Sequence, residues 1–176
     1  MKISELTIPR FYGRRKGRPL RQGMRNLLND MLPDLRFDAT RPIASQFGKA
    51  SSRHTDLALE IGFGGGEHLA GLAEANPAVN FIGAEPFVNG VASLLRHIQT
   101  RQLSNIRIWD DDVRLILPHL PVAGLSRVFI MFPDPWPKKR HAARRILQPE
   151  MMDVLAQLIR PSGQLVLASD DPTAKG

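Results

Sequence analysis

The chain has 176 residues, 43% of them hydrophobic, no cysteine, and a net charge of +7 at pH 7. This composition is typical of about one folded domain and excludes a wholly disordered chain. The lack of cysteine excludes a disulfide framework, a thiolate nucleophile and a zinc–thiolate site. We expect a cytoplasmic protein, because the N-terminus lacks the apolar core of a secretory signal and no apolar run is long enough to span a membrane.

The positive charge is concentrated near the N-terminus. Residues 1–53 carry 12 basic and 4 acidic side chains, whereas residues 54–176 carry 12 basic and 13 acidic ones. We therefore predict a basic, partly flexible extension over 1–53 and a folded domain over 54–176. Residues 11–25, here called the basic arm, mix arginines with glycine and proline, so a long helix is not expected there. The arm could follow a phosphate backbone, with Phe11 or Tyr12 stacking on bases, or it could be a solvated tail.

Strand and helix patterns alternate through the predicted domain. In chain order the predicted elements are a short helix over 27–32, a strand over 57–61, a helix over 67–75, a strand over 81–84, a helix over 88–99, a strand over 106–109, a short helix over 113–117, a strand over 127–132, a helix over 149–159 and a strand over 165–168. This alternation predicts an α/β fold, with mostly parallel strands and helices on both faces of the sheet.

Acidic side chains stand at or near the ends of the predicted strands, where ligands bind in parallel sheets. They are Glu60, Glu85, Asp111, Asp134 and, after the fifth strand, Asp170. Several carboxylates together would repel a pyrophosphate and attract a ligand with an ammonium group, a sulfonium and ribose hydroxyls, such as S-adenosylmethionine. For any single acid, the alternative is a solvated loop residue or a helix cap.

A glycine loop follows the first predicted strand, with the sequence Glu60-Ile61-Gly62-Phe63-Gly64-Gly65-Gly66. A dinucleotide fingerprint would need a further glycine at position 67, where this chain has Glu67. Glu67 and the acidic side chains at the ends of the predicted strands argue against a nicotinamide oxidoreductase. Without a ligand, the loop would be a tight turn between a strand and a helix.

Two motifs resemble those of a known family. Glu60-x-Gly62-x-Gly64-x-Gly66 is similar to motif I of the class I methyltransferases. The segment Phe132-Pro133-Asp134-Pro135-Trp136-Pro137-Lys138, followed by Arg140-His141 and Arg144-Arg145, resembles a signature of the bacterial tRNA (guanine-N7)-methyltransferases. Phe11-x-Gly13-Arg14-Arg15 and Leu103-Ser104-Asn105-Ile106 also resemble that family, so the likeness covers nearly the whole chain. Because the family continues beyond the fifth strand, we expect this domain to be incomplete at its C-terminus, without the last strands of the sheet.

The resemblance implies a Rossmann-like class I methyltransferase that transfers a methyl group from S-adenosylmethionine to N7 of a guanine in tRNA, at position 46 of the variable loop. The cofactor-binding residues that it implies are Glu60, Gly62, Gly64, Gly66, Glu85, Asp111 and Asp134. Asp134 would also act at the reaction centre. The residues that would contact the RNA are Arg14, Arg15, Lys138, Arg140, Arg144, Arg145 and Asp170. No metal site is expected, because the histidines lack ligand spacing.

Several interpretations remain open. Trp136 could stack on the target base or could only cover the end of the sheet. An adenine-N6 methyltransferase is a second candidate, because Asp134-Pro135-Trp136 is similar to the D-P-P-W motif of such enzymes, although the second proline is missing. A third candidate is a tRNA-binding protein without catalytic activity.

Overall fold

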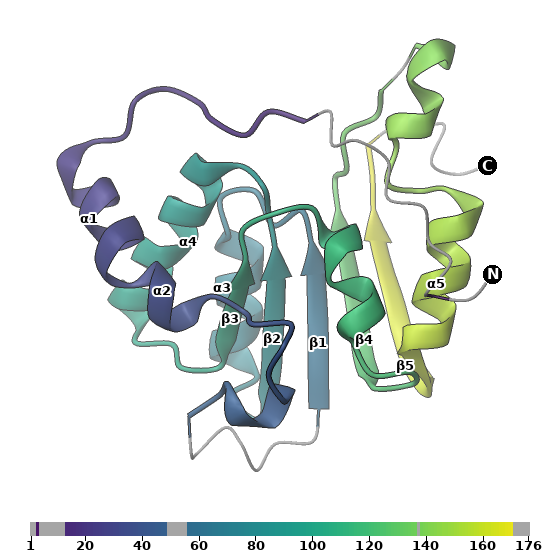
Figure 1. Cartoon of the computed structure of the whole chain (residues 1–176), viewed down its shortest axis with the longest axis horizontal. Helices are drawn as coiled ribbons and strands as arrows, with labels where there is room; N and C mark the ends of the chain where they lie inside the picture. The colour runs from purple at the N-terminus through teal and green to yellow at the C-terminus, as the bar shows by residue number, and fades with distance from the viewer. Residues whose placement is uncertain (1–2, 4–12, 49–55, 137, 171–176) are drawn as a thin grey trace.

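A parallel β-sheet forms the centre of the molecule. The structure is a computed structural model that describes residue 3 and residues 13–48, 56–136 and 138–170. The strands lie in the order β3-β2-β1-β4-β5, and every neighbouring pair is parallel (Figure 1). Their bounds are β1 (Asp56–Ile61), β2 (Val79–Ala84), β3 (Ile106–Trp109), β4 (Leu125–Met131) and β5 (Ile159–Ala168). The predicted α/β fold with a parallel sheet is confirmed.

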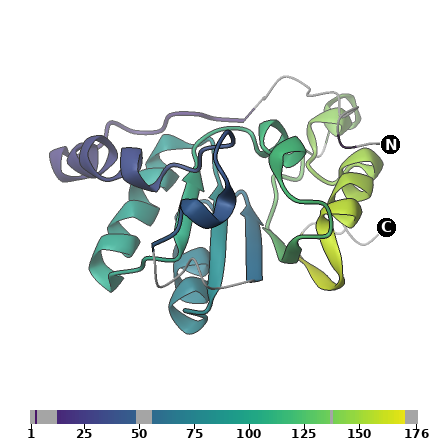
Figure 2. The ribbon, with the colours of Figure 1, turned by 60° about the horizontal axis from the view of Figure 1, so that its bottom comes forward.

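Helices cover both faces of this sheet (Figures 1 and 2). One face packs against α3 (Glu67–Ala75) and α4 (Val88–Arg101), with α1 (Gln22–Asp30) and α2 (Leu32–Leu35) beside α4 and β3. The other face packs against α5 (Pro149–Leu158) and the two 3₁₀ turns η4 (Val113–Leu115) and η5 (Leu117–His119). The prediction of one short helix over 113–117 is therefore wrong, since Pro118 has no amide hydrogen to continue a helix.

Successive side chains of β1 point to opposite faces of the sheet. Leu57, Leu59 and Ile61 belong to the core beneath α5, whereas Ala58 belongs to the core beneath α3 and α4. Glu60 shares the face of Ala58 because side chains in a strand alternate with a period of two. Strand alternation thus places Glu60 and its neighbour Ile61 on opposite sides of the sheet. Only one of these two side chains can therefore point into a given cavity.

The fifth strand begins earlier than the predicted range 165–168. Pro161 and Gly163 are typical of a turn, and the sequence pattern alone therefore misses this part of β5. The register between β4 and β5 shifts between Leu125 and Arg127, which leaves extra residues of β5 in an irregular stretch. β5 forms one edge of the described sheet, and an edge strand tolerates proline because only one side of it must pair.

Part of the predicted N-terminal extension packs on the sheet. Leu32, Phe37 and Phe47 are buried in the two hydrophobic cores. The Phe37 amide donates to the Ile108 carbonyl at 2.7 Å, which covers the outer edge of β3. The boundary predicted between residues 53 and 54 lies outside the described residues.

Candidate functional site

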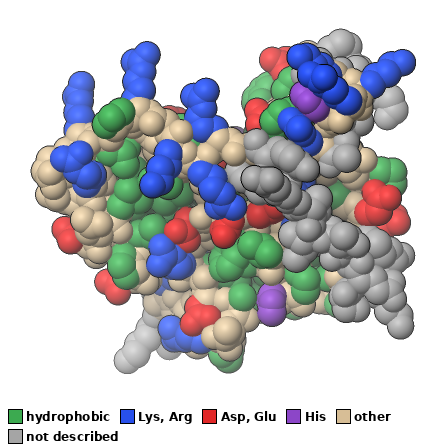
Figure 3. Space-filling model, turned by 45° about the horizontal axis from the view of Figure 1, so that its top comes forward, with side chains coloured by type: hydrophobic (Ala, Val, Ile, Leu, Met, Phe, Trp, Pro, Cys, Tyr) green, Lys and Arg blue, Asp and Glu red, His purple; other side chains and the backbone are tan. Residues whose placement is uncertain are grey.

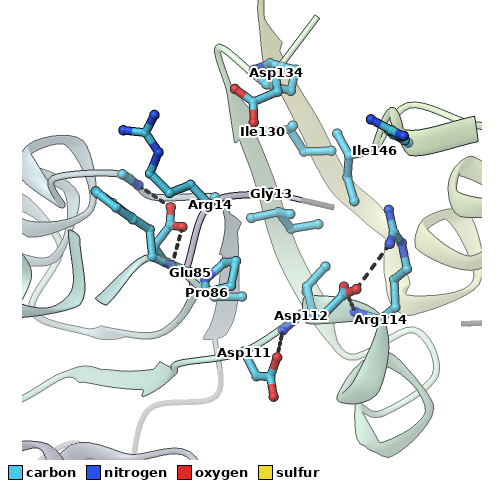
Figure 4. A pocket seen from close by; sticks show the side chains of 18 of the residues that line it. Gly13, Arg14, Glu85, Pro86, Asp111, Asp112, Arg114, Ile130, Asp134 and Ile146 are labelled. Atoms are coloured by element: carbon cyan, nitrogen blue, oxygen red, sulfur yellow. Dashed lines mark hydrogen bonds and ion pairs between the residues drawn. The ribbon is translucent and has the colours of Figure 1, made fainter. Parts of the chain in front are cut away.

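A cavity of about 460 Å³ opens at the carboxyl ends of the strands (Figure 4). Its wall includes parts of the glycine loop, the ends of β2, β3 and β4, and the start of the basic arm. The predicted site residues that line it are Arg14, Gly62, Gly64, Glu85, Asp111, Asp134 and Arg144. The volume is within the range of pockets that bind small molecules.

The glycine loop presents bare backbone to this cavity. Gly62 and Gly64 have φ values of 72° and 57°, a conformation that favours glycine. A Cβ built on either residue would have no atom within 4 Å, so the space in front of them is open. On the other side of the loop, a Cβ on Gly90 of α4 would collide with the Gly64 carbonyl oxygen. The loop is therefore packed closely against α4 and open towards the cavity.

Glu85 connects the glycine loop to the start of α4. Its two carboxylate oxygens accept hydrogen bonds from the Gly64 amide at 2.8 Å and the Phe87 amide at 3.0 Å. Burial raises the pKa of Glu85, these two hydrogen bonds lower it, and the charge of Asp134 raises it again. The influence of Asp134 agrees with Figure 4, where the two carboxylates lie on the same cavity.

Asp134 lies in the loop that follows β4, between two prolines that restrict the backbone. Within the described residues its carboxylate has no hydrogen bond or ion pair. The loop is held by the Arg145 guanidinium, which donates to the carbonyl oxygens of Pro135 at 3.0 Å and Trp136 at 3.1 Å. Arg145 thus stabilises the conformation of this loop in the free protein.

Arginines pair with the acids at the end of β3. Arg15 of the basic arm contacts Asp111 at 2.7 Å, and the buried Arg114 contacts the buried Asp112 at 3.1 Å. Asp112 and Arg114 both line the cavity, although sequence reasoning assigned neither of them to the site. Of the four cavity-lining carboxylates, the remaining two, Glu85 and Asp134, have no ion-pair partner among the described residues. The negative charge available to a ligand is therefore concentrated on these two groups.

Glu60 and Gly66 do not line the cavity. Glu60 is 1% exposed and hydrogen-bonds to Nδ1 of His68 at 3.0 Å. Burial raises the pKa of Glu60, whereas the hydrogen bond and the charge of His68 lower it. Gly66, with φ 82°, precedes α3 and packs against Leu94. No local sequence pattern indicates that His68 pairs with Glu60, because a lone histidine on a helix is usually a surface residue.

The basic arm is held against α4. The Val88 amide donates to the Arg15 carbonyl at 2.9 Å, and the Asn89 side chain accepts from Gly17 N and donates to the Arg18 carbonyl, both at 2.8 Å. These contacts hold residues 15–18 at the start of α4, and Gly13 and Arg14, which precede them, line the cavity. Asn89 is a further residue that sequence reasoning missed. Phe11 and Tyr12 lie outside the described part of the chain.

A second basic segment stands on the other side of the cavity. Figure 3 shows the Lys and Arg side chains in two groups along the upper rim, with acidic side chains between them. Lys138 and Arg140 are exposed, as is Asp170, and none of these three lines the cavity. Arg144 does line it and lies over the Trp136 ring, 5.1 Å from the ring centre.

The structure offers no metal centre in its described part, where no three His, Asp or Glu side chains come together as a ligand group. None of the helices in the described residues has both the length and the apolar character needed to cross a membrane.

Comparisons with known proteins show which family this chain is similar to. Residues 54–175 match a family described as putative methyltransferase. The tRNA (guanine-N(7)-)-methyltransferase of Paramagnetospirillum magneticum is 52% identical over 170 residues, which is 93% of this chain and 70% of the relative. That of Rhodospirillum rubrum is 48% identical over 173 residues, which is 92% of this chain and 65% of the relative.

Among solved structures, a 30S ribosomal A1408 methyltransferase from an uncultured bacterium superposes with a TM-score of 0.52 at 14% identity. The match covers 77% of this chain and 65% of that one. At this identity the likeness supports the methyltransferase fold and nothing more specific.

Proposed function

Because the chain belongs to the tRNA (guanine-N(7)-)-methyltransferase family, we propose that it transfers a methyl group from S-adenosylmethionine to N7 of a guanine in tRNA. The observation that carries this proposal is the pair of carboxylates, Glu85 and Asp134, that face one cavity between two basic segments. In this proposal residues 54–176 hold the cofactor and residues 1–53 supply the arm that contacts RNA, and the reaction takes place in the cytoplasm.

The cavity fits the proposed cofactor in size and in chemistry. The open space in front of Gly62 and Gly64 leaves room for a ligand to lie against the backbone. The carboxylate of Glu85 keeps acceptor capacity beyond its two amide bonds, and ribose hydroxyls can donate to it. When bound, S-adenosylmethionine supplies an electrophilic methyl group on a positively charged sulfur. The two carboxylates without a cationic partner provide a negative potential that favours such a ligand.

The chain's own contribution to the reaction is positioning. Guanine N7 carries an unprotonated lone pair, so the protein need not remove a proton before N7 attacks. We assign Asp134 to the guanine, where its carboxylate accepts hydrogen bonds from N1–H and N2–H₂ and stabilises positive charge that develops on the ring. A carboxylate without another partner is suited to this role, because it loses no existing contact when the base arrives.

The two basic segments are suited to phosphate contacts on either side of the cavity. The described arm carries Arg14, Lys16 and Arg18 on one side, and Lys138 and Arg140 are exposed on the other. Contacts to phosphates add affinity and fix orientation without reading sequence. In this proposal the cations fix the position of the tRNA on the protein, and the residues of the cavity carry out the reaction.

The test is to incubate unmodified tRNA with a labelled methyl donor and this protein, and then to identify the methylated nucleoside. N7-methylguanosine is the expected product. N6-methyladenosine would support the adenine-N6 alternative, and tRNA binding with no product would support the non-catalytic alternative.

A further inference from the structure

Phe132 is the one exposed aromatic residue in the described part of the chain. The residue is 64% exposed, yet it lines the same cavity as Asp134. A large apolar ring in water costs free energy unless something covers it. A single exposed apolar residue is common on protein surfaces, so the exposure becomes informative only together with the backbone that holds the ring.

The backbone holds Phe132 in an unfavourable conformation. Its φ is 50°, in the left-handed region that a bulky residue other than glycine rarely adopts. The Phe132 amide donates to the Ala168 carbonyl at the end of β5 at 2.7 Å, which fixes this turn. Residues in such conformations persist where the surrounding structure imposes them, and they gather at active sites and ligand-binding sites. Trp136, four residues later in the same loop, also has a positive φ, 43°. The backbone is therefore constrained at both aromatic residues, but only Phe132 is exposed.

Two other aromatic residues, Phe87 and Trp136, line the cavity, and both are half-buried. Gly17 of the basic arm packs against the tip of the Phe87 ring, and Trp136 already has ring partners. The Arg144 guanidinium lies 5.1 Å from the centre of its ring, and the His141 ring meets it edge-on at 5.8 Å. Within the described residues Phe132 has no aromatic or cation–π partner. The ring that is available to a planar ligand is therefore that of Phe132.

We propose that Phe132 is the surface on which the target guanine stacks, an inference that rests on the function proposed above. Enzymes that modify a base in a structured nucleic acid take it out of its stack, and aromatic side chains replace the stacking that is lost. Phe132 contacts the face of the guanine, and Asp134, two residues later on the same cavity, contacts its edge. In this assignment Trp136 has a different role, which is to stabilise the loop through its contacts with Arg144 and His141.

The test compares Phe132→Ala, Phe132→Leu and Phe132→Tyr with the wild-type protein. The measurements are kcat/KM for tRNA, the Kd for S-adenosylhomocysteine and the Tm. We expect Phe132→Ala to lower kcat/KM by about five- to 150-fold, the effect of losing one base–aromatic stack. Phe132→Tyr restores most of the loss and Phe132→Leu does not, because stacking needs an aromatic face. The Tm and the Kd stay unchanged in all three variants. Val122→Ala, at a residue 71% exposed just before β4 begins, is the matched control and changes nothing.

Three results would overturn the inference. They are an unchanged kcat/KM in Phe132→Ala, full rescue by Phe132→Leu, or a fall in Tm that accompanies the loss of activity, which would show that the ring packs against protein. The failure of the proposed function is a separate result: wild-type protein that makes no N7-methylguanosine.

Discussion

The contact between the glycine loop and α4 permits a prediction with a built-in control. Gly90, in the first turn of α4, has no room for a side chain, because a Cβ there would collide with the Gly64 carbonyl oxygen and lie 3.4 Å from Cγ of Glu85. Gly71, in the middle of α3, would have no atom within 4 Å of an added Cβ. The same substitution by alanine is therefore expected to have opposite effects on the stability of the protein in these two helices.

The magnitudes follow from these surroundings. Alanine is favoured over glycine in a helix by up to about 1 kcal/mol, so Gly71→Ala should raise the free energy of unfolding by about 0.5–1 kcal/mol. At Gly90 the same gain is opposed by a clash with backbone, for which overpacking costs about 1–3 kcal/mol or more. Since about 1 kcal/mol corresponds to roughly 2–4 °C in a chain of this size, Gly71→Ala should raise the Tm and Gly90→Ala should lower it.

Gly90→Ala should also weaken cofactor binding. To make room for the new methyl group the Gly64 peptide must move, and its amide is a hydrogen-bond donor to Glu85. A hydrogen bond to a charged group contributes about 1.5–3 kcal/mol, so we expect the Kd for S-adenosylhomocysteine to rise by about tenfold or more.

Thermal denaturation and calorimetric titration of the two variants measure both effects. The reasoning would be refuted if the two alanine variants shifted the Tm in the same direction. It would also be refuted if Gly90→Ala bound S-adenosylhomocysteine with wild-type affinity. The contact between Gly90 and the glycine loop would then have no effect on how the loop binds the cofactor.

Three further predictions concern charged groups. Asp134→Asn should abolish methyl transfer, and it should leave unchanged the Tm and the Kd for S-adenosylhomocysteine, whose sulfur is uncharged, because this exposed carboxylate has no partner in the described protein. Lost binding of S-adenosylhomocysteine with normal turnover at saturation would contradict the assignment of Asp134. Lys16→Gln, which removes an exposed cation of the arm, should lower the salt dependence of tRNA binding by about one unit of log–log slope. Arg101→Gln, which removes an exposed ion pair between α3 and α4, should leave the slope unchanged. For Glu60, burial raises the pKa, so the native state binds this proton more tightly than the unfolded chain does, and stability falls as the pH rises above the ordinary range of a carboxyl group. The Tm of Glu60→Gln should therefore exceed that of the wild type more at pH 8 than at pH 4.5, and an equal difference at both pH values would contradict the prediction.

The fold class and many element bounds could be predicted from local sequence. The helix over 67–75 and the strand over 106–109 have the bounds that their patterns predict, because hydrophobic periodicity and nearby glycine or proline act within a few residues. The family could also be predicted, since the segment around Asp134 keeps its motif in consecutive residues. The start of β5 could not, because Pro161 and Gly163 indicate a turn and only pairing with β4 accommodates them in a strand.

The arrangement of the carboxylates was decided by the tertiary structure. In the sequence, four acidic residues stand in the same way at or near the ends of strands: Glu60, Glu85, Asp111 and Asp134. Strand alternation, however, turns Glu60 away from the cavity. Asp111 pairs with Arg15, 96 positions away in the chain, a distance over which no local pattern carries information. Local spacing thus determined which elements form and which motif they present. Burial and long-range pairing, which depend on the whole fold, decided which charges remain for a ligand.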